Sequence, residues 1–213
     1  MITCGRRSNK FFFVKSLFNE MFGNLSTRPL GQFADFFSGY AFKSDKFTTK
    51  GAPVIRISNI QNGEIDVSDL VFYPELEVSS LERYTTKKND VLIAMSGATT
   101  GKVAIIRSPD KFYINQRVGC FRSKSGLMRN EFLYAFLNTD AVRNAILSAS
   151  SGCAQPNISG NQLKELEIPF APFEAQNQFV EKLQQIDKLR FNCAFFVKIQ
   201  TREDDCDPRK GSL

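Results

Sequence analysis

The side chains in this sequence that could do chemistry are hydrogen-bonding and cationic groups rather than catalytic ones. They gather in short stretches between apolar runs: residues 96–102, Asn115-Gln116-Arg117, and Gln155 with Asn157. Arg and Lys donate hydrogen bonds, Asn and Gln donate and accept them, and hydroxyls bind phosphate oxygens. These residue types can read the edges of nucleic-acid bases. The alternative for each position taken singly is an ordinary turn-forming residue, which is the more frequent case.

The sequence does not provide a catalytic centre of a familiar kind. It contains no histidine, so a Ser–His–Asp or Cys–His arrangement cannot be built. Residues 97–102 superficially resemble a phosphate-binding loop, but Val103 stands where that motif needs Ser or Thr. The glycine-rich and Asn-Pro-Pro-Tyr motifs of methyl transfer are also absent. We therefore predict a binding protein that is not an enzyme and has no cofactor.

The cysteine residues and the hydropathy of the sequence indicate the cellular compartment of the protein. The five cysteines are an odd number without a Cys-x-x-Cys pair: Cys4, Cys120, Cys153, Cys193 and Cys206. They predict free thiols in a reducing cytoplasm and no metal site. Arg6-Arg7 resembles a twin-arginine signal, but Lys15 interrupts the apolar run that follows. We expect a cytoplasmic protein without a membrane-spanning segment.

The charge is distributed unevenly along the chain. The net charge is +6, yet residues 64–82 hold six acidic residues and no Lys or Arg. Residues 83–129 hold ten Lys or Arg and two Asp, a local net charge of +8. A basic zone beside an acidic one suits an anionic partner bound in one orientation. Solvated charges on loops and strand edges are the alternative.

The elements that must position these side chains are predicted to be short strands and helices. Apolar spacing predicts an amphipathic helix over residues 11–22, followed by a linker at residues 28–31. Strands are predicted at residues 53–58, 67–72, 90–95, 103–107, 118–122 and 166–169. Short helices are predicted at residues 130–137 and 139–147, and a polar loop at residues 148–162. The polar stretches therefore fall in loops between strands.

The last element is the longest predicted helix, from about residue 174 to 200. Its apolar seam recurs at spacings near 3.5 and consists of Phe179, Leu183, Ile186, Cys193 and Val197. Such a narrow seam is typical of a coiled-coil strand. The alternative is a long helix packed on its own domain. The predicted fold class is α+β: a mixed, mainly β globular domain with short helices, followed by a long coiled-coil-forming α-helix.

The order of several segments resembles the specificity subunits of type I restriction–modification systems. The segments are residues 30–31, 36–44, 51–60, 90–97, 101–104, 114–118 and 151–158, and then Ile168-Pro169 with Pro172, Glu174 and Gln176. Residues 18–23 resemble the end of the long helix that precedes a second recognition domain. Residues 173–176 read Phe-Glu-Ala-Gln where the family commonly has Leu-Glu-Glu-Gln. The chain thus resembles the second half of such a subunit, with a single target-recognition domain.

The resemblance implies an organisation, a function and partners. It implies an N-terminal extension with a helical stub (1–27), a DNA-binding target-recognition domain (28–172), a dimerisation and spacer helix (173–200) and a flexible tail (201–213). The domain would read double-stranded DNA and direct methyltransferase subunits, and indirectly a restriction subunit, to a split target. Pairing with a second copy as a homodimer, or with a different half subunit, would complete the specificity subunit with its two recognition domains. The target bases and the roles of the first ten and last thirteen residues stay open.

The resemblance and the basic stretch together mark a set of candidate DNA-binding residues. They are Lys43, Ser44, Arg56, Asn59, Ser96, Thr99, Thr100, Lys102, Asn115, Gln116, Arg117, Gln155 and Asn157. Gln155 and Asn157 could equally brace their loop against the neighbouring strand. A different function is also open: an interaction fragment that pairs with a full-length specificity subunit or a methyltransferase and reads no DNA.

Overall fold

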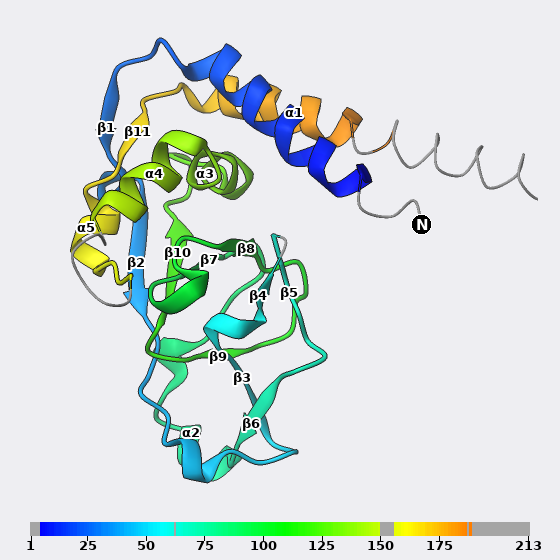
Figure 1. The fold of residues 1–213 in the computed structure, drawn as a ribbon, viewed down its shortest axis with the longest axis vertical. Helices are drawn as coiled ribbons and strands as arrows, with labels where there is room; N and C mark the ends of the chain where they lie inside the picture. The colour runs from blue at the N-terminus through cyan, green and yellow to red at the C-terminus, as the bar shows by residue number, and fades with distance from the viewer. Residues whose placement is uncertain (1–4, 62, 150–155, 187, 189–213) are drawn as a thin grey trace, which may run out of the picture.

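The computed structural model describes residues 5–61, 63–149, 156–186 and 188, and it has the predicted α+β character (Figure 1). The longer helices gather at one end, a four-stranded sheet lies in the middle and a smaller three-stranded sheet forms the far end. Among the described residues no helix is long and apolar enough to cross a membrane.

The central sheet has the strand order β2-β10-β7-β8, with each neighbouring pair antiparallel. Its strands are β2 (Ala34–Ser38), β7 (Val91–Ala94), β8 (Val103–Ile105) and β10 (Val118–Ser123). The predictions for β7, β8 and β10 are confirmed, whereas β2 was not predicted. Every residue of β7 and β8 is buried, because apolar side chains pack on both faces of the sheet.

The far-end sheet has the order β6-β3-β9 and a core of its own. It consists of β3 (Ala52–Ile55), β6 (Val71–Tyr73) and β9 (Tyr113–Ile114), and the helix α2 (Glu75–Val78) lies beside it. The small ribbon of β4 (Ile60–Gln61) and β5 (Glu64–Ile65) instead packs against β7 and β8 of the central sheet. Three predicted strands were too long, among them the one at residues 103–107, which ends at Ile105. The strand predicted to residue 58 ends at Ile55, since a 3-10 turn (Ile57–Asn59) follows, and residues 67–70 are not strand.

The predicted linker at residues 28–31 is wrong. Thr27–Pro29 forms strand β1, which pairs with β11 (Glu167–Pro169), and Leu30 is fully buried. A short helix in the predicted polar loop was also missed: α5 (Gly160–Lys164). Ser159 caps it, since the backbone N–H of Gln162 donates to the Ser159 hydroxyl and the Gln162 side chain accepts from Ser159 N–H.

The helical end shares one core with the central sheet. It contains α1 (Gly5–Phe22), α3 (Asn130–Leu137), α4 (Asp140–Ala149) and a helix at residues 173–186. The rings of Phe18, Phe22, Phe132 and Phe179 meet there at centroid distances from 4.9 to 6.3 Å. In Figure 1, α1 and the helix at 173–186 lie side by side. The first described turns of the last helix therefore pack on their own chain.

This packing corrects the assignment of Phe179 to a partner-facing seam, because Phe179 is fully buried inside the chain. Leu183 packs against the same core and is partly buried. Ile186 is also partly buried. Cys193 and Val197 lie outside the described residues, so the coiled coil beyond residue 188 remains a prediction. Of the five cysteines, Cys120 alone lies within the described part; it is a free thiol, and burial raises its pKa.

Gln176, part of the segment that carried the resemblance, has a structural role. It is 2% exposed; its side-chain oxygen accepts from Arg129 N–H at 2.9 Å, and its amide nitrogen donates to the carbonyls of Leu127 and Ala171 at 3.1 and 3.0 Å. The side chain therefore ties the start of the last helix to the turn before α3.

We expect Gln176→Ala to lower the free energy of unfolding by about 1–3 kcal/mol, because it leaves three backbone groups without partners. Urea unfolding measures the change. The control is Gln178→Ala, at an exposed position in the same helix, which should stay within about 0.5 kcal/mol of the original chain. Equal stability of the two variants would contradict this role of Gln176.

Candidate nucleic-acid interface

One end of the central sheet collects loops that are far apart in the sequence. The end of β7 leads into residues 96–102, and Met95 N–H donates to Arg117 C=O at 2.9 Å. Ile158 N–H donates to Met95 C=O at 2.9 Å, and Tyr40 N–H donates to Ile114 C=O at 2.9 Å. The loops at residues 96–102 and 115–117 and the segment at residues 156–158 are thus neighbours, as the sequence prediction requires of a common surface.

Four predicted side chains are exposed at this end of the sheet. They are Lys102, Gln116, Arg117 and Asn157. Neither Lys102 nor Arg117 forms an ion pair with any described residue. Two unpaired cations and two amides are the donors and acceptors needed to bind phosphates and base edges.

The loop at residues 96–102 is anchored rather than free. Thr100 donates its hydroxyl to Gly97 C=O at 2.7 Å and to Pro156 C=O at 3.1 Å, and Gly97 N–H also donates to Pro156 C=O. Thr100 therefore braces the loop from within. Gly97 and Gly101 have φ of +75° and +81°, which favours glycine at both turns. The hydroxyls of Ser96 and Thr99 are buried and have no hydrogen-bond partner among the described residues.

Asn59 and Arg56 are committed to the fold, contrary to their assignment as DNA contacts. Asn59 is 1% exposed. Its side-chain oxygen accepts a hydrogen bond from Arg56 N–H, and its side-chain amide nitrogen donates to the backbone carbonyls of Asp66 and Asp69. Arg56 bonds the Asp69 carboxylate at 3.1 Å and the Asp69 carbonyl at 3.2 Å. Both side chains hold the segment that follows β3, and for Asn59 the physical reason is that a buried polar group must find partners.

The remaining predicted residues divide between the two ends of the domain. Asn115 is partly buried beside Arg117, and its N–H donates to Ile55 C=O at 2.9 Å. Lys43 and Ser44 are exposed, but they lie at the far end, in the turn whose Lys46 pairs with Glu77 of α2. The structure does not bring them together with the loop at residues 96–102. Gln155 lies outside the described residues.

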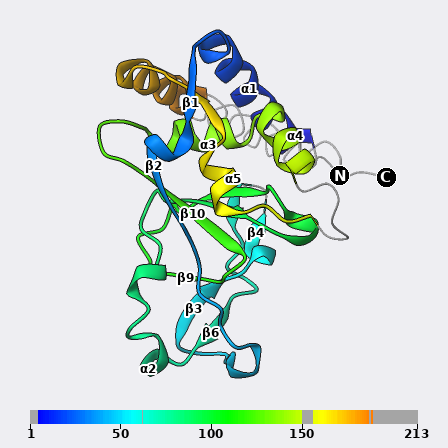
Figure 2. The ribbon, with the colours of Figure 1, turned by 90° about the vertical axis from the view of Figure 1, so that its left-hand side faces the viewer.

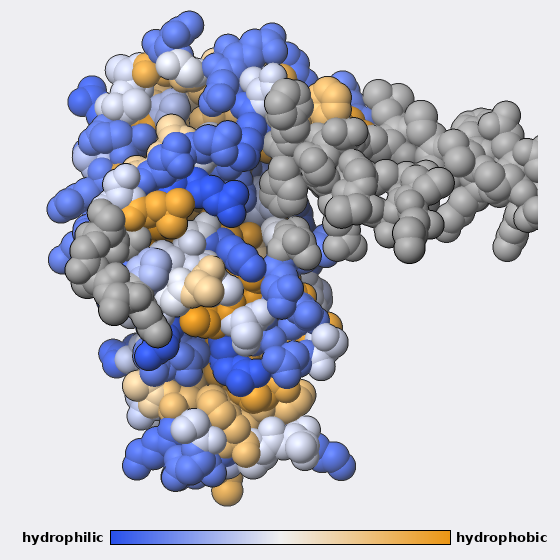
Figure 3. Space-filling model, in the orientation of Figure 1, coloured by the Kyte–Doolittle hydropathy of each residue, from blue (hydrophilic) through white to orange (hydrophobic). Residues whose placement is uncertain are grey.

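The charge of the basic stretch is partly neutralised by ion pairs. Arg122 pairs with buried Asp90 at 2.6 Å, and this hydrogen bond raises the pKa of Arg122. Three further cations of this stretch have carboxylate partners: Lys111, Lys124 and Arg129. Six exposed cations form no ion pair with a described residue: Arg83, Lys87, Lys88, Lys102, Arg107 and Arg117. The face seen in Figure 3 is mostly hydrophilic, with smaller apolar areas.

Comparison with known proteins places this arrangement in a family. Residues 24–192 match the type I restriction modification DNA specificity domain. The chain belongs to that family. The match covers every loop of the candidate interface, together with α5 and the helix at residues 173–186.

Individual relatives agree with the assignment to this specificity-domain family. The chain is 32% identical over 173 residues to the type I restriction enzyme EcoAI specificity subunit of Escherichia coli, covering 79% of this chain and 29% of the relative. It is 28% identical over 181 residues to the MjaVIII specificity subunit of Methanocaldococcus jannaschii, covering 83% and 43%. The chain therefore spans less than half the length of these relatives.

Solved structures share the fold at lower sequence identity. The HsdS subunit from Thermoanaerobacter tengcongensis superposes with a TM-score of 0.62 at 17% identity, covering 86% of this chain and 44% of that chain. A chain from a structure of a type I R-M system, solved to explain its assembly and conformational transition, gives 0.66 at 16% identity, covering 93% and 49%. These structures support the mixed sheet-and-helix architecture of the specificity domain.

Proposed function

We propose that this specificity-domain chain recognises double-stranded DNA and directs methyltransferase subunits, and indirectly a restriction subunit, to their target. The observation that carries the proposal is the gathering of unpaired Lys102 and Arg117 with Gln116 and Asn157 at one end of the sheet. Cations supply affinity for phosphates, and Arg and amide side chains discriminate bases. The chain supplies recognition and no catalysis of its own.

We further propose that two recognition domains act together. A target read by two domains is split, and the distance between its halves follows from the rigid connection between the domains. The chain spans less than half the length of its curated relatives. In this proposal a second copy or a different half subunit supplies the other domain. Two copies related by a two-fold axis would read a symmetric split site.

Methylome sequencing tests this proposal. The chain is expressed together with a type I methyltransferase subunit in a host without such a system, and a culture expressing the methyltransferase alone is the control. We expect methylation at one interrupted motif that appears only when both are present. A symmetric motif indicates self-pairing, and an asymmetric motif indicates a different half. Absence of any motif despite a purified complex of the two proteins would favour the interaction-fragment function.

A further inference from the structure

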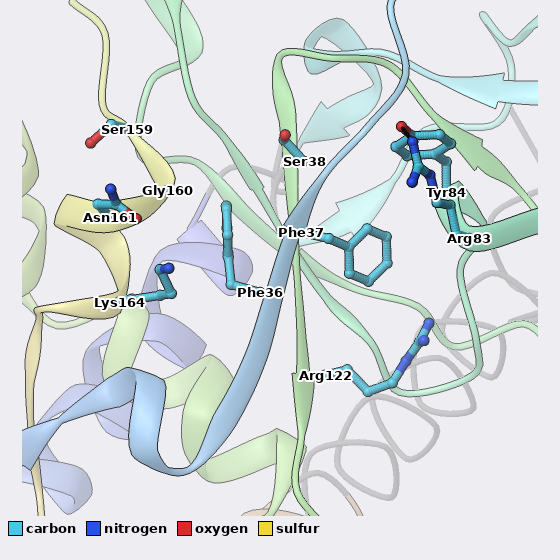
Figure 4. Close-up of a pocket in the computed structure, with 10 residues that line it drawn as sticks. All are labelled: Phe36, Phe37, Ser38, Arg83, Tyr84, Arg122, Ser159, Gly160, Asn161 and Lys164. Carbon is cyan, nitrogen blue, oxygen red and sulfur yellow. Dashed lines mark hydrogen bonds between the residues drawn. The ribbon is translucent and has the colours of Figure 1, made fainter. Parts of the chain in front are cut away.

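A groove crosses the free edge of the central sheet beside the candidate interface. It holds about 770 Å³ and is lined from both sides of β2: by Ser159, Gly160, Asn161 and Lys164 at α5, and by Arg83, Tyr84 and Arg122 on the other side. Figure 4 shows β2 running between these two groups, and Figure 2 shows α5 beside the strand. A volume of this size accommodates a small ligand or a few units of a polymer backbone, and it is too small for a whole duplex.

Two consecutive aromatic residues of β2 form the apolar walls of the groove. Phe36 points toward α5 and Phe37 points toward Arg122, as Figure 4 shows, because neighbouring side chains on a strand lie on opposite faces. The Phe36 ring leaves no room for larger residues beside it. A Cβ atom on Gly119 or Gly160 would come within 2.6 or 2.5 Å of that ring. The two glycines therefore allow α5 and β10 to close around Phe36.

The polar lining carries uncompensated positive charge. Arg83 and Lys164 are exposed, and neither forms an ion pair with a described residue. The Arg83 guanidinium lies 4.6 Å from the centroid of the Tyr84 ring, which orients it. Arg122, by contrast, is neutralised by Asp90 and lies over the Phe37 ring at 5.3 Å.

The acidic residues nearest the cationic side chains in sequence do not cancel this charge. Glu82, next to Arg83, pairs with Lys111. Asp35 lies opposite Arg122 in the strand register, and Lys124 is 3.8 Å from its carboxylate. Glu165 follows Lys164 and forms no ion pair with it. The groove thus presents two available cations, from segments about 80 positions apart in the sequence, to whatever lies across β2.

Residues that line the groove adjoin the candidate interface along the chain at two points. Ser159 follows the segment at residues 156–158, and Asn157 is bridged to Ser96. Ser38 leads directly to Tyr40, which is bridged to Asn115. The groove therefore lies close enough to Arg117 and Asn157 for one extended polymer to contact both places.

We infer that this groove binds the phosphate–sugar backbone of one DNA strand next to the bases that the loops contact, with Arg83 and Lys164 as its phosphate-binding residues. The inference rests on the proposed function and adds a location for backbone binding outside the loop tips. Charge complementarity favours a polyanion, and Ser38, Ser159 and Asn161 add uncharged donors for phosphate and sugar oxygens.

The test measures how the binding constant of the full chain for a duplex of arbitrary sequence depends on salt. Each phosphate contact contributes about 0.9 to the slope of log K against log salt. We expect Arg83→Ala and Lys164→Ala each to reduce the slope by about 0.9, and the double variant by about 1.8. Arg83→Lys should restore the slope, because it keeps the charge. Lys50→Ala removes an exposed far-end cation and should leave the slope unchanged.

The outcomes separate this inference from the proposed function. Binding of the original chain to duplex DNA, with unaltered slopes in the Arg83 and Lys164 variants, would overturn the groove assignment alone. Absence of duplex binding by the original chain would overturn both. A further expected result is an equal loss of affinity for the methylated motif and for arbitrary sequence, since backbone contacts carry no base information. A change in the motif itself in these variants would contradict a backbone role.

Discussion

The double variant Lys102→Ala/Arg117→Ala is expected to bind target duplex about 100-fold more weakly than the original chain, if each side chain contributes about 1–2 kcal/mol. Both side chains are exposed at the sheet end and unpaired among the described residues. Removing them therefore takes away the proposed contacts with DNA without breaking an ion pair between described residues. Fluorescence anisotropy with a labelled duplex at fixed salt measures the loss.

Two comparisons make this result specific to DNA recognition. Lys43→Ala/Lys50→Ala removes the same charge from the far end, where Lys43 and Lys50 are exposed, and should change affinity less than about threefold. Co-purification with the methyltransferase subunit should be unchanged in both double variants. Unaltered DNA retention by Lys102→Ala/Arg117→Ala would remove the sheet end as the interface and favour the interaction-fragment function.

The second large effect concerns the helix at residues 173–186. We expect Phe179→Ala to lower the free energy of unfolding by about 3–5 kcal/mol, the usual range for deleting a buried phenylalanine ring. Phe179 is fully buried and contacts the rings of Phe18, Phe22 and Phe132 at centroid distances of 5.8, 5.5 and 6.3 Å. Its loss would open a cavity between α1, α3 and the last helix.

Urea unfolding at several protein concentrations measures this effect and separates it from pairing between chains. A side chain buried within its own chain gives a loss of stability that does not depend on concentration, whereas a seam between chains gives one that does. Leu76→Ala is the control, since Leu76 is 93% exposed, and should change stability by less than about 0.5 kcal/mol. A loss of stability in Phe179→Ala that depends on protein concentration would instead support a place for Phe179 in the partner-facing seam.

The local pattern of apolar residues predicted many of the helices and strands in the helical end and the central sheet. The apolar run of residues 90–95 predicted β7, and the spacing of Phe132, Leu133, Phe136 and Leu137 predicted α3, because each pattern matches the period of one kind of element. The ends of the helices and strands were harder to predict from the sequence. The strand predicted over residues 53–58 stops at Ile55 because the Asn59 side chain bonds the Arg56 N–H and closes a turn, a contact that apolar spacing does not encode.

The sequence by itself identified the residue types of the candidate DNA-binding surface and the order of segments that marks the family. Only the tertiary structure decided which of those residues share a surface: it brings the loops of Lys102, Arg117 and Asn157 together, buries Asn59, and places Lys43 at the far end. It also brought Arg83 and Lys164 to the two sides of β2. The physical reason is that strand pairing and burial set the neighbours of a side chain, and both depend on segments distant in the chain.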